Sequence, residues 1–303
     1  MQQTSSRVTL LGSNGGPRVR KNRYGPSNLI QDRNHTVVVD CGPGVVRRLS
    51  DVNVELSEID AIYITHCHSD HVIELGALLM LAWAGGRTTP ITVYGPPPTA
   101  RLVSLQLASY EFDIDIRIRD EGRPDLRELV RVHEITQPGE VSESLLPVTS
   151  ARVHHPPIED AFAYRFELEG MSVTFSGDTT PCSALTELAR GSDVLIHEAI
   201  YMPFLQEMGR RLPSASRMVE HLRDSHTDAA SLGKIAQETN VKHLILNHLV
   251  PGTDDITDEQ WLARVGTIKN TQVTLGHDLL SFTPDDIFQE RPLTEGSCLS
   301  VFS

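Results

Sequence analysis

Short apolar runs alternate with longer helix-like stretches along most of the chain. Fully apolar segments at 37–39 and 61–64 are typical of strands that are buried on both faces of a sheet. An apolar stretch at 72–83 and an alanine-rich stretch at 228–238 predict helices. The order predicts two successive strand-rich halves that each carry helices, with no linker or repeat between them.

Three further regions have weaker patterns. Residues 113–119 alternate apolar and charged side chains, which predicts a half-exposed strand. Residues 161–167 alternate again and are followed after a short turn by 171–175, so the two segments predict a β-hairpin. Residues 201–225 show no sustained period, and we expect a loop with helical turns there.

The most unusual stretch is 65–71, Thr-His-Cys-His-Ser-Asp-His, directly after the apolar run at 61–64. Side chains two residues apart on an extended backbone leave on the same side, so His66 and His68 can share one metal ion. Asp70 and His71 come where the next helix begins and can serve a second ion. Because these side chains follow a buried strand, where layered α/β folds place active-site groups, they predict a metal site rather than a solvated turn.

Other candidate ligands also follow predicted strands. His155 would complete the first site, and its rival is His154, because strand alternation lets only one of them face the metals. We favour His155, which lies at the strand end. His248 would complete the second site, and Asp178 can bridge both ions with its two oxygens. The predicted metal ligands are His66, His68, Asp70, His71, His155, Asp178 and His248.

Two carboxylates keep alternative roles. Asp40 ends an apolar strand, where it can accept the free N–H of a ligating histidine or cap the turn that follows. Asp178 can bridge metals or cap the next helix. Sequence reasoning favours the functional role for both.

The order His-x-His-x-Asp-His at 66–71 resembles the signature of the metallo-β-lactamase superfamily, whose members are mostly zinc hydrolases. Further motifs resemble its ribonuclease Z and arylsulfatase-like branch, namely Leu11-Gly12-Ser13, Ala161-Phe162-Ala163-Tyr164-Arg165, Ser176-Gly177-Asp178-Thr179, His197-Glu198-Ala199 and His226-Thr227. The resemblance implies an α/β fold, a four-layered αββα sandwich, as one domain over 1–283 with a tail at 284–303. It also implies a metal-bound hydroxide at a site with two zinc ions, although His/Asp sets accept manganese and iron too.

The resemblance also implies a group that assists the leaving oxygen. In that branch the glutamate of His-Glu-Ala and the histidine before the alanine-rich helix do this, so Glu198 and His226 take these roles here. Asp70 is expected to be catalytic as well as a ligand. The alternatives are a charged loop residue for Glu198 and a helix cap for His226.

Charge and chain length between motifs guide the substrate prediction. The 27 Lys and Arg residues face 40 Asp and Glu residues, and a formal charge of -13 disfavours a phosphate polymer. Ribonuclease Z usually carries a long Gly/Pro-rich arm that grips transfer RNA, whereas only residues 167–174 fill that interval here. We therefore expect a small organic substrate, such as an aryl sulfate, phosphodiester, ester, lactone or activated aryl halide, and expect nucleic acid to be disfavoured. The alternatives are a ribonuclease Z-like endonuclease acting on RNA 3′ ends and a metal-binding regulatory protein without turnover.

The walls of the substrate pocket have no recognisable motif. The basic loop at 18–23 can be solvated or contact the substrate, and we favour the solvated role. Four aromatic residues are candidates for a pocket lining, namely Trp83, Phe112, Tyr201 and Phe204.

Composition also bears on location. Four scattered cysteines without a CxxC pair indicate reduced thiols, and no leader precedes the first strand, so we expect a cytoplasmic protein. The longest apolar run is too short to cross a bilayer. A homodimer is common for such folds.

Overall fold

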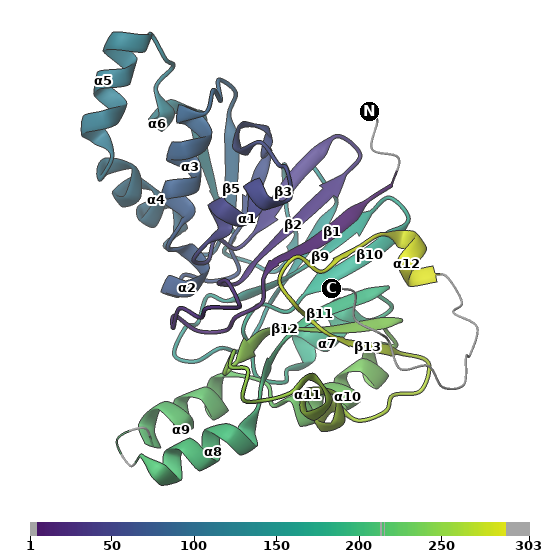
Figure 1. Ribbon diagram of the computed structural model, residues 1–303. Coiled ribbons are helices and arrows are strands. Elements are labelled where there is room, and N and C mark those ends of the chain that lie inside the picture. The colour runs from purple at the N-terminus through teal and green to yellow at the C-terminus, as the bar shows by residue number, and fades with distance from the viewer. Residues whose placement is uncertain (1–4, 213, 215, 289–303) are drawn as a thin grey trace, which may run out of the picture.

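Two seven-stranded mixed sheets form the centre of the molecule and pack face to face (Figure 1). The computed structural model describes residues 5–212, 214 and 216–288. The first sheet runs in the order β14 (Ser281–Phe282), β1 (Arg7–Gly12), β2 (Ser27–Asp32), β3 (His35–Val39), β4 (Ala61–Tyr63), β5 (Ile91–Gly95) and β6 (Val130–Glu134). The second runs in the order β13 (Gln272–Leu275), β12 (His243–Val250), β11 (Val194–Ile200), β10 (Met171–Phe175), β9 (Phe162–Leu168), β8 (Val148–Arg152) and β7 (Gly139–Glu140).

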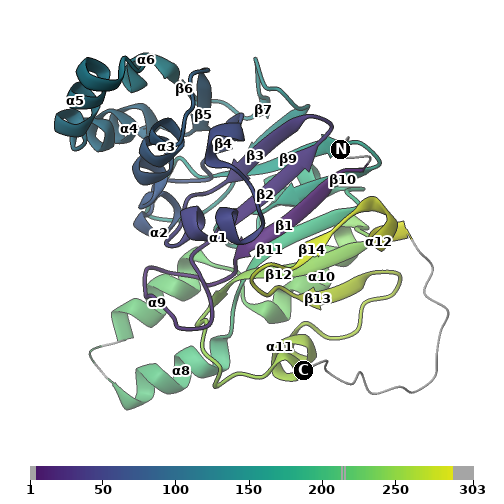
Figure 2. The same cartoon turned by 45° about the horizontal axis from the view of Figure 1, so that its top comes forward.

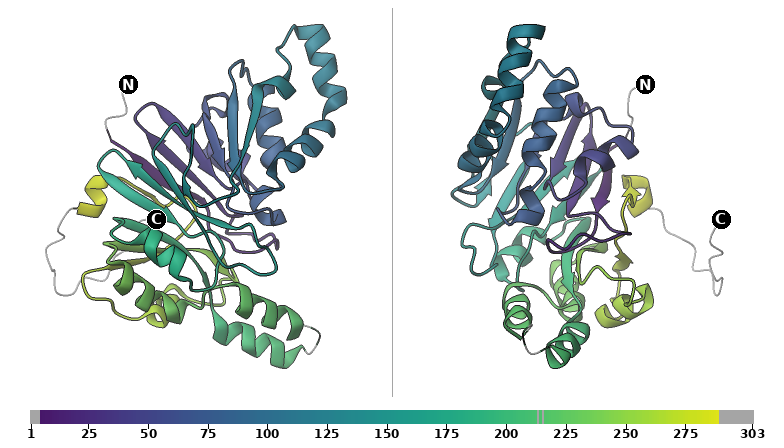
Figure 3. Two further views of the ribbon diagram at one scale, coloured as in Figure 1. Left: turned by 180° about the vertical axis from the view of Figure 1, so that it is seen from behind. Right: turned by 60° about the vertical axis from the view of Figure 1, so that its left-hand side comes forward.

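Helices cover the outer faces of both sheets, as the views in Figures 2 and 3 show. Those beside the first sheet are α1 (Val45–Asp51), η1 (Leu56–Glu58), α2 (Ser69–Val72), α3 (Leu75–Ala84), α4 (Thr99–Ala108), α5 (Glu111–Glu121) and α6 (Leu126–Leu129). Those beside the second are α7 (Ser183–Ala189), α10 (Ala229–Thr239) and α11 (Asp258–Val265). The predicted four-layered αββα sandwich is therefore confirmed. The remaining helices are α8 (Met202–Arg211), α9 (Ser216–Ser225) and α12 (Pro284–Phe288).

Strand alternation explains why the central strands are apolar throughout. In β4, Tyr63 points into the core between the sheets, whereas Ile62 points outward into the cluster beneath the helices. Tyr63 stacks on Tyr94 at 4.6 Å between ring centroids and meets Phe166 of the other sheet edge-on at 5.1 Å. Each face of the strand is thus buried against a different layer, which fixes the register of the strands that carry the site.

The strand predicted at 113–119 is wrong, because this segment lies within the helix α5. Ile114 is fully buried and Ile118 partly buried, and these two residues are four apart on the helix face that meets the core. Arg117 pairs with Asp113 and with Glu121, each four residues away along the helix. The alternation of apolar and charged residues matches the period of a strand by chance. The segment is helical because its apolar face packs against the neighbouring helices.

The loop expected at 201–225 is also wrong, because the structure forms the two helices α8 and α9 there. They project from the sandwich at the lower left of Figure 1. Apolar side chains hold them together, with Met208 on α8 and Val219 and Leu222 on α9 in one small cluster. The apolar residues of these two helices are therefore confined to a narrow stripe on each. So few apolar positions do not produce a clear helical period in the sequence.

The predicted hairpin is present, with β9 and β10 antiparallel and joined by a tight turn at 169–170. Of the expected tail at 284–303, residues 284–288 form α12 and 289–303 lie outside the described residues. The domain boundary at 283 stays a prediction. None of the helices in the described part of the chain is long and apolar enough to cross a membrane.

Candidate metal centre and cleft

The candidate ligands meet at one edge of the sandwich. Asp40 follows β3, the stretch 65–71 follows β4, and Asp178 follows β10. Strands β3 and β4 are parallel, as are β10, β11 and β12, so their carboxyl ends lie together. Strands from both sheets therefore deliver polar side chains to the same place, as the sequence predicted.

A first group joins His66, His68, His155 and Asp178, whose donor atoms all lie within 4.8 Å of one another. The Nδ1 atom of His68 lies 3.0 Å from Nε2 of His66 and 3.0 Å from Nε2 of His155. His155 is fully buried, whereas His154 is exposed. The structure thus decides between the two neighbours in favour of His155.

A second group joins Asp70, His71 and His248. The Nε2 atoms of the two histidines are 3.3 Å apart, and Oδ2 of Asp70 lies 3.4 Å from Nε2 of His248. Oδ2 of Asp178 lies 3.4 Å from His71 and 3.3 Å from His248, so Asp178 touches both groups. All seven predicted ligands are therefore brought together.

The donor set fits divalent metal ions. Burial lowers the pKa of His66, His68 and His155, that of His68 to about 4, so these rings are neutral at pH 7 and keep a lone pair. Oδ1 of Asp178 is buried and has no hydrogen-bond partner among the described residues. A buried carboxylate oxygen without a partner is costly unless a cation binds it. Several donor atoms from neutral rings and carboxylates therefore converge on a centre that favours positive charge.

Hydrogen bonds behind the ligands orient the rings. Nδ1 of His71 donates to Oδ2 of Asp40 at 2.9 Å, and Nδ1 of His155 donates to the backbone carbonyl of Ser225 at 2.8 Å. Each bond holds the proton on Nδ1 and leaves Nε2 free to face the centre. Asp40 thus occupies the orienting position expected for it, and its Oδ1 also accepts a bond from the backbone N–H of Thr65.

A bulge places His248. In the pairing of β11 with β12, Glu198 lies opposite Asn247 and Ala199 lies opposite Leu249, so His248 has no partner across the ladder. Its φ of 43° is in the left-handed region. Bulges commonly redirect a side chain beside an active site, and this one turns His248 toward the ligands. Strand β12 therefore continues past the bulge to Val250.

Glycines allow two close approaches at the centre. A Cβ atom on Gly15 would lie 2.7 Å from Nδ1 of His248, so only glycine lets this loop cross over the ring. Gly177 has a φ of 57°, and a Cβ there would lie 2.8 Å from the carbonyl oxygen of Phe162. Gly177 thereby sets the turn that presents Asp178.

Glu198 and His226 form a buried pair beside the ligands. Oε1 of Glu198 accepts hydrogen bonds from Nδ1 of His226 at 3.2 Å and from the backbone N–H groups of Thr179 and Thr227. Burial lowers the pKa of His226, but the carboxylates of Glu198 and then Asp178 outweigh it and raise the pKa to about 9. The ring is therefore protonated at neutral pH and lines the cleft.

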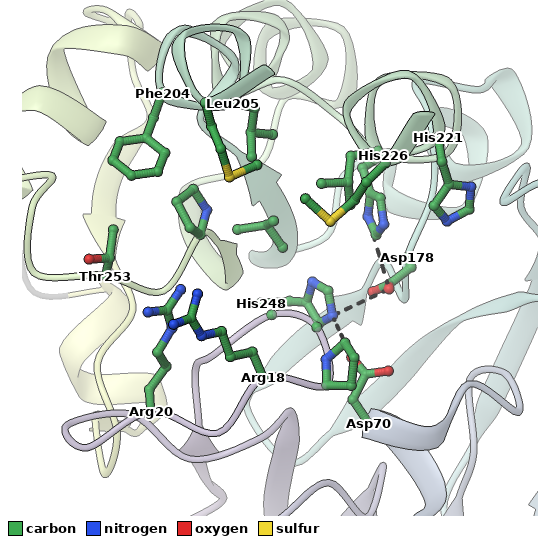
Figure 4. A pocket seen from close by; sticks show the side chains of 18 of the residues that line it. Arg18, Arg20, Asp70, Asp178, Phe204, Leu205, His221, His226, His248 and Thr253 are labelled. Atoms are coloured by element: carbon green, nitrogen blue, oxygen red, sulfur yellow. Dashed lines mark hydrogen bonds and ion pairs between the residues drawn. The ribbon is translucent and has the colours of Figure 1, made fainter. Parts of the chain in front are cut away.

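A cleft of about 880 Å³ opens above these residues (Figure 4). Its floor includes Asp70, Asp178 and His248, and helices α8 and α9 form one side. Sequence reasoning missed this wall, and it expected the loop at 18–23 to be solvated, whereas Arg18 and Arg20 line the cleft. The cluster of basic residues at 18–23 was the one sequence feature that could have indicated this part of the cleft.

Only one of the four candidate pocket aromatics lines this cleft, namely Phe204. Trp83 is buried in the cluster beneath the first sheet. Phe112 is 81% exposed on α5. Tyr201 packs against Trp261. The tertiary arrangement therefore separates these side chains.

Comparison with known proteins gives a consistent family. A model described as a beta-lactamase superfamily domain matches residues 35–249. Ribonuclease Z of Mycobacterium bovis (strain BCG / Pasteur 1173P2) is 31% identical over 275 residues, which is 90% of this chain and 96% of that protein. Ribonuclease Z of Mycolicibacterium gilvum is 32% identical over 275 residues, covering 90% of this chain and 94% of that protein.

Solved structures agree on the fold. The metallo-beta-lactamase fold protein YhfI from Bacillus subtilis matches with a TM-score of 0.67 at 20% identity, covering 92% of this chain and 99% of that one. The short form of human tRNase Z matches with a TM-score of 0.63 at 19% identity, covering 91% of this chain and 98% of that one.

These relatives correct the substrate prediction. The expected small organic substrate, with nucleic acid disfavoured, is wrong, because the relatives aligned over nearly their whole length are ribonucleases. The arylsulfatase-like half of the resemblance is not supported either. The net charge misled because it averages over the whole surface, whereas Arg18 and Arg20 line the cleft. The short β9–β10 turn likewise does not exclude a ribonuclease. The chain belongs to the metallo-β-lactamase superfamily and is a metal-dependent hydrolase related to ribonuclease Z.

Proposed function

We propose that the chain is a ribonuclease Z-like endonuclease that cleaves RNA near its 3′ end. The observation that carries this proposal is the 31% identity with the Mycobacterium bovis ribonuclease Z across 96% of that protein. The cationic residues in the cleft support it, because a phosphodiester backbone needs local positive charge.

Two zinc ions are part of the proposal. His66, His68 and His155 would hold one ion, Asp70, His71 and His248 would hold the other, and Asp178 would contact both. When bound, such ions supply Lewis acidity and lower the pKa of water toward neutrality. The unpartnered Oδ1 of Asp178 supports a ligand at that atom beyond the contacts of Oδ2.

The protein's own contribution to the reaction is to hold a proton near the scissile bond. Glu198 orients the His226 ring through Nδ1 and, by its charge, keeps the ring protonated. From the cleft wall, His226 would donate its proton to the departing oxygen. Glu198 acts through His226 and is a positioning residue.

The test is cleavage of a precursor transfer RNA with an unpaired 3′ extension by zinc-loaded protein, with chelator-treated protein beside it. We expect one chelator-sensitive cut near the 3′ end. His68→Ala or Asp178→Ala should lower the rate by several orders of magnitude and release metal. Intact RNA after prolonged incubation with fully loaded wild-type protein would reject the proposal.

Replacing His226 with Ala tests the proton donor. The variant should keep both zinc ions and cleave about 100-fold or more slowly, within the range typical of a lost general acid. Zinc content and single-turnover rates measure the two effects. An unchanged rate would return His226 to the role of a helix cap. The cytoplasmic location and the homodimer stay predictions.

A further inference from the structure

The cleft has two chemically different walls. Arg18 and Arg20 lie on one side and Phe204 and Leu205 on another in Figure 4. The second side continues along α8 and α9 with further apolar residues, namely Met208, Leu212, Met218 and Leu222. The metal-binding candidates form the floor between them. A ligand that reaches the floor must therefore pass a cationic surface and an apolar one.

The apolar wall retains surface that the fold does not bury. Met218 is 47% exposed and Leu212 is 55% exposed, although both line the cleft. The inner part of the α8–α9 helix pair is packed, with Leu205 fully buried against α9 and β12. The outer part is therefore not needed to hold the helices together, and its exposed apolar area is available to a ligand.

The cationic wall is similarly free. Within residues 5–212, 214 and 216–288, the side chains of Arg18 and Arg20 form no ion pair and no hydrogen bond, whereas Arg211 pairs with Glu207 at 2.8 Å. The two arginines come from one loop in a chain whose formal charge is -13. They thus form a local positive surface in the same cleft as Asp70 and Asp178, which suits phosphate groups that approach the metal ions.

We propose that this cleft binds the unpaired nucleotides of an RNA next to the scissile phosphate, with bases on the apolar wall and phosphates on Arg18 and Arg20. The proposal rests on the proposed function and names the part of the substrate that this site reads. An unpaired nucleotide presents an apolar base face and an anionic phosphate on opposite sides, which matches the two walls. A duplex stacks its bases inside the helix and hides their faces. Unpaired nucleotides are therefore the ligand that can contact both the apolar and the cationic wall.

Contacts to base faces are tolerant of sequence, because every base has an apolar face. A base that covers Met218 or Leu212 also removes exposed apolar surface from water, which favours binding. The apolar wall should therefore recognise unpaired RNA without selecting a base. Phosphate contacts add a salt-dependent term that is also independent of sequence.

The decisive experiment places abasic sites one at a time in the unpaired nucleotides on both sides of the cut. With wild-type protein, at least one abasic position should raise KM by about tenfold. On intact RNA, Met218→Ala and Leu212→Ala should raise KM by a similar factor. On the RNA that is abasic at that position, these variants should raise KM little further, because the side chain and the base contact each other and either loss removes the same contact. Phe112→Ala is the matched control, since this exposed aromatic lies outside the cleft.

The cationic wall has its own readout. Arg20→Ala should weaken binding and reduce the slope of log KM against log salt concentration by about 1. It should respond to every abasic substrate as wild type does. Arg101→Ala, on the exposed side of α4, is the control and should leave the slope unchanged.

Binding separates this inference from the proposed function. Anisotropy of a labelled single-stranded RNA on zinc-loaded His226→Ala protein, which is expected to cleave about 100-fold more slowly, reports binding to the cleft before the RNA is cut. If Met218→Ala weakens RNA binding but the wild-type protein does not cleave, the proposed nuclease function is rejected and the proposed RNA-binding role of the cleft is kept. If neither an abasic site nor any of the wall variants changes cleavage or binding, the proposed RNA-binding role of the cleft is wrong. Circular dichroism and thermal unfolding confirm that each variant is folded.

Discussion

Replacing Asp40 with Asn tests how the orientation of His71 supports metal binding. Asp40 is 4% exposed, its Oδ2 accepts from Nδ1 of His71, and its Oδ1 accepts from the backbone N–H of Thr65. Asparagine has the same shape but only one acceptor oxygen. One of the two buried bonds must therefore be lost in either orientation of the amide.

If the amide nitrogen faces His71, two donors meet and the ring must move its proton to Nε2. That nitrogen then has no lone pair for a metal ion. If the amide turns over, the N–H of Thr65 is left without an acceptor at a cost of about 1–3 kcal/mol. A tenfold factor corresponds to about 1.4 kcal/mol. In both orientations a neutral amide replaces the carboxylate that raises the basicity of His71. Zinc affinity should therefore be weaker by about 10- to 100-fold, the range seen for partners of metal-binding histidines.

Competition with a fluorescent zinc chelator measures the affinity. Asp32→Asn is the matched control, because Asp32 is also buried and accepts a bond from the backbone N–H of Glu169 far from the centre. The control should lose stability and keep zinc affinity. Unchanged affinity in folded Asp40→Asn protein would refute the reasoning.

The remaining predictions concern other parts of the molecule. Gly177→Ala should displace Asp178, because the added Cβ meets a backbone carbonyl, and lower turnover by about 100-fold with loss of zinc; full zinc content in the variant would contradict this. Burial raises the pKa of Asp193, but hydrogen bonds, first the one from Lys242, lower it overall. Its contribution to stability is therefore present above the unfolded pKa of about 3.9 and is lost as the pH falls through the lower pKa of the folded protein. Asp193→Asn should thus lower the melting temperature at pH 7, and the difference from wild type should shrink as the pH falls below about 3.9. Ile114→Ala should cost about 2–5 kcal/mol in urea unfolding and leave kcat unchanged, because α5 packs on the core away from the cleft; a variant as stable as wild type would place Ile114 outside that core.

Local chemistry explains why the sequence could name residues that the structure brings together. The spacing of His66 and His68 after an apolar strand, and the position of Asp178 after another, are properties of short segments. Strand alternation and metal-ligand chemistry act over two to six residues, so one sequence is enough to use them. The fold class was predicted from the order of strands and helices together with the resemblance of the 66–71 motif to the metallo-β-lactamase superfamily.

Long-range packing explains which predictions failed. Residues 113–119 are a helix because Ile114 packs on neighbouring helices, and the segment 201–225 is a helix pair because its narrow apolar stripes meet each other. Propensity is a weak prior when tertiary contacts oppose it.

The sequence by itself predicted the αββα fold through its resemblance to the superfamily, and it named the candidate ligands and favoured an orienting role for Asp40. Only the tertiary structure decided that His155 and not His154 faces the centre, that a bulge turns His248 inward, and that a basic loop faces an apolar hairpin across the cleft. The physical reason is separation along the chain. Net charge and chain order do not show which distant side chains line one cavity. The electrostatic potential in the cleft depends on the charged side chains that line it together.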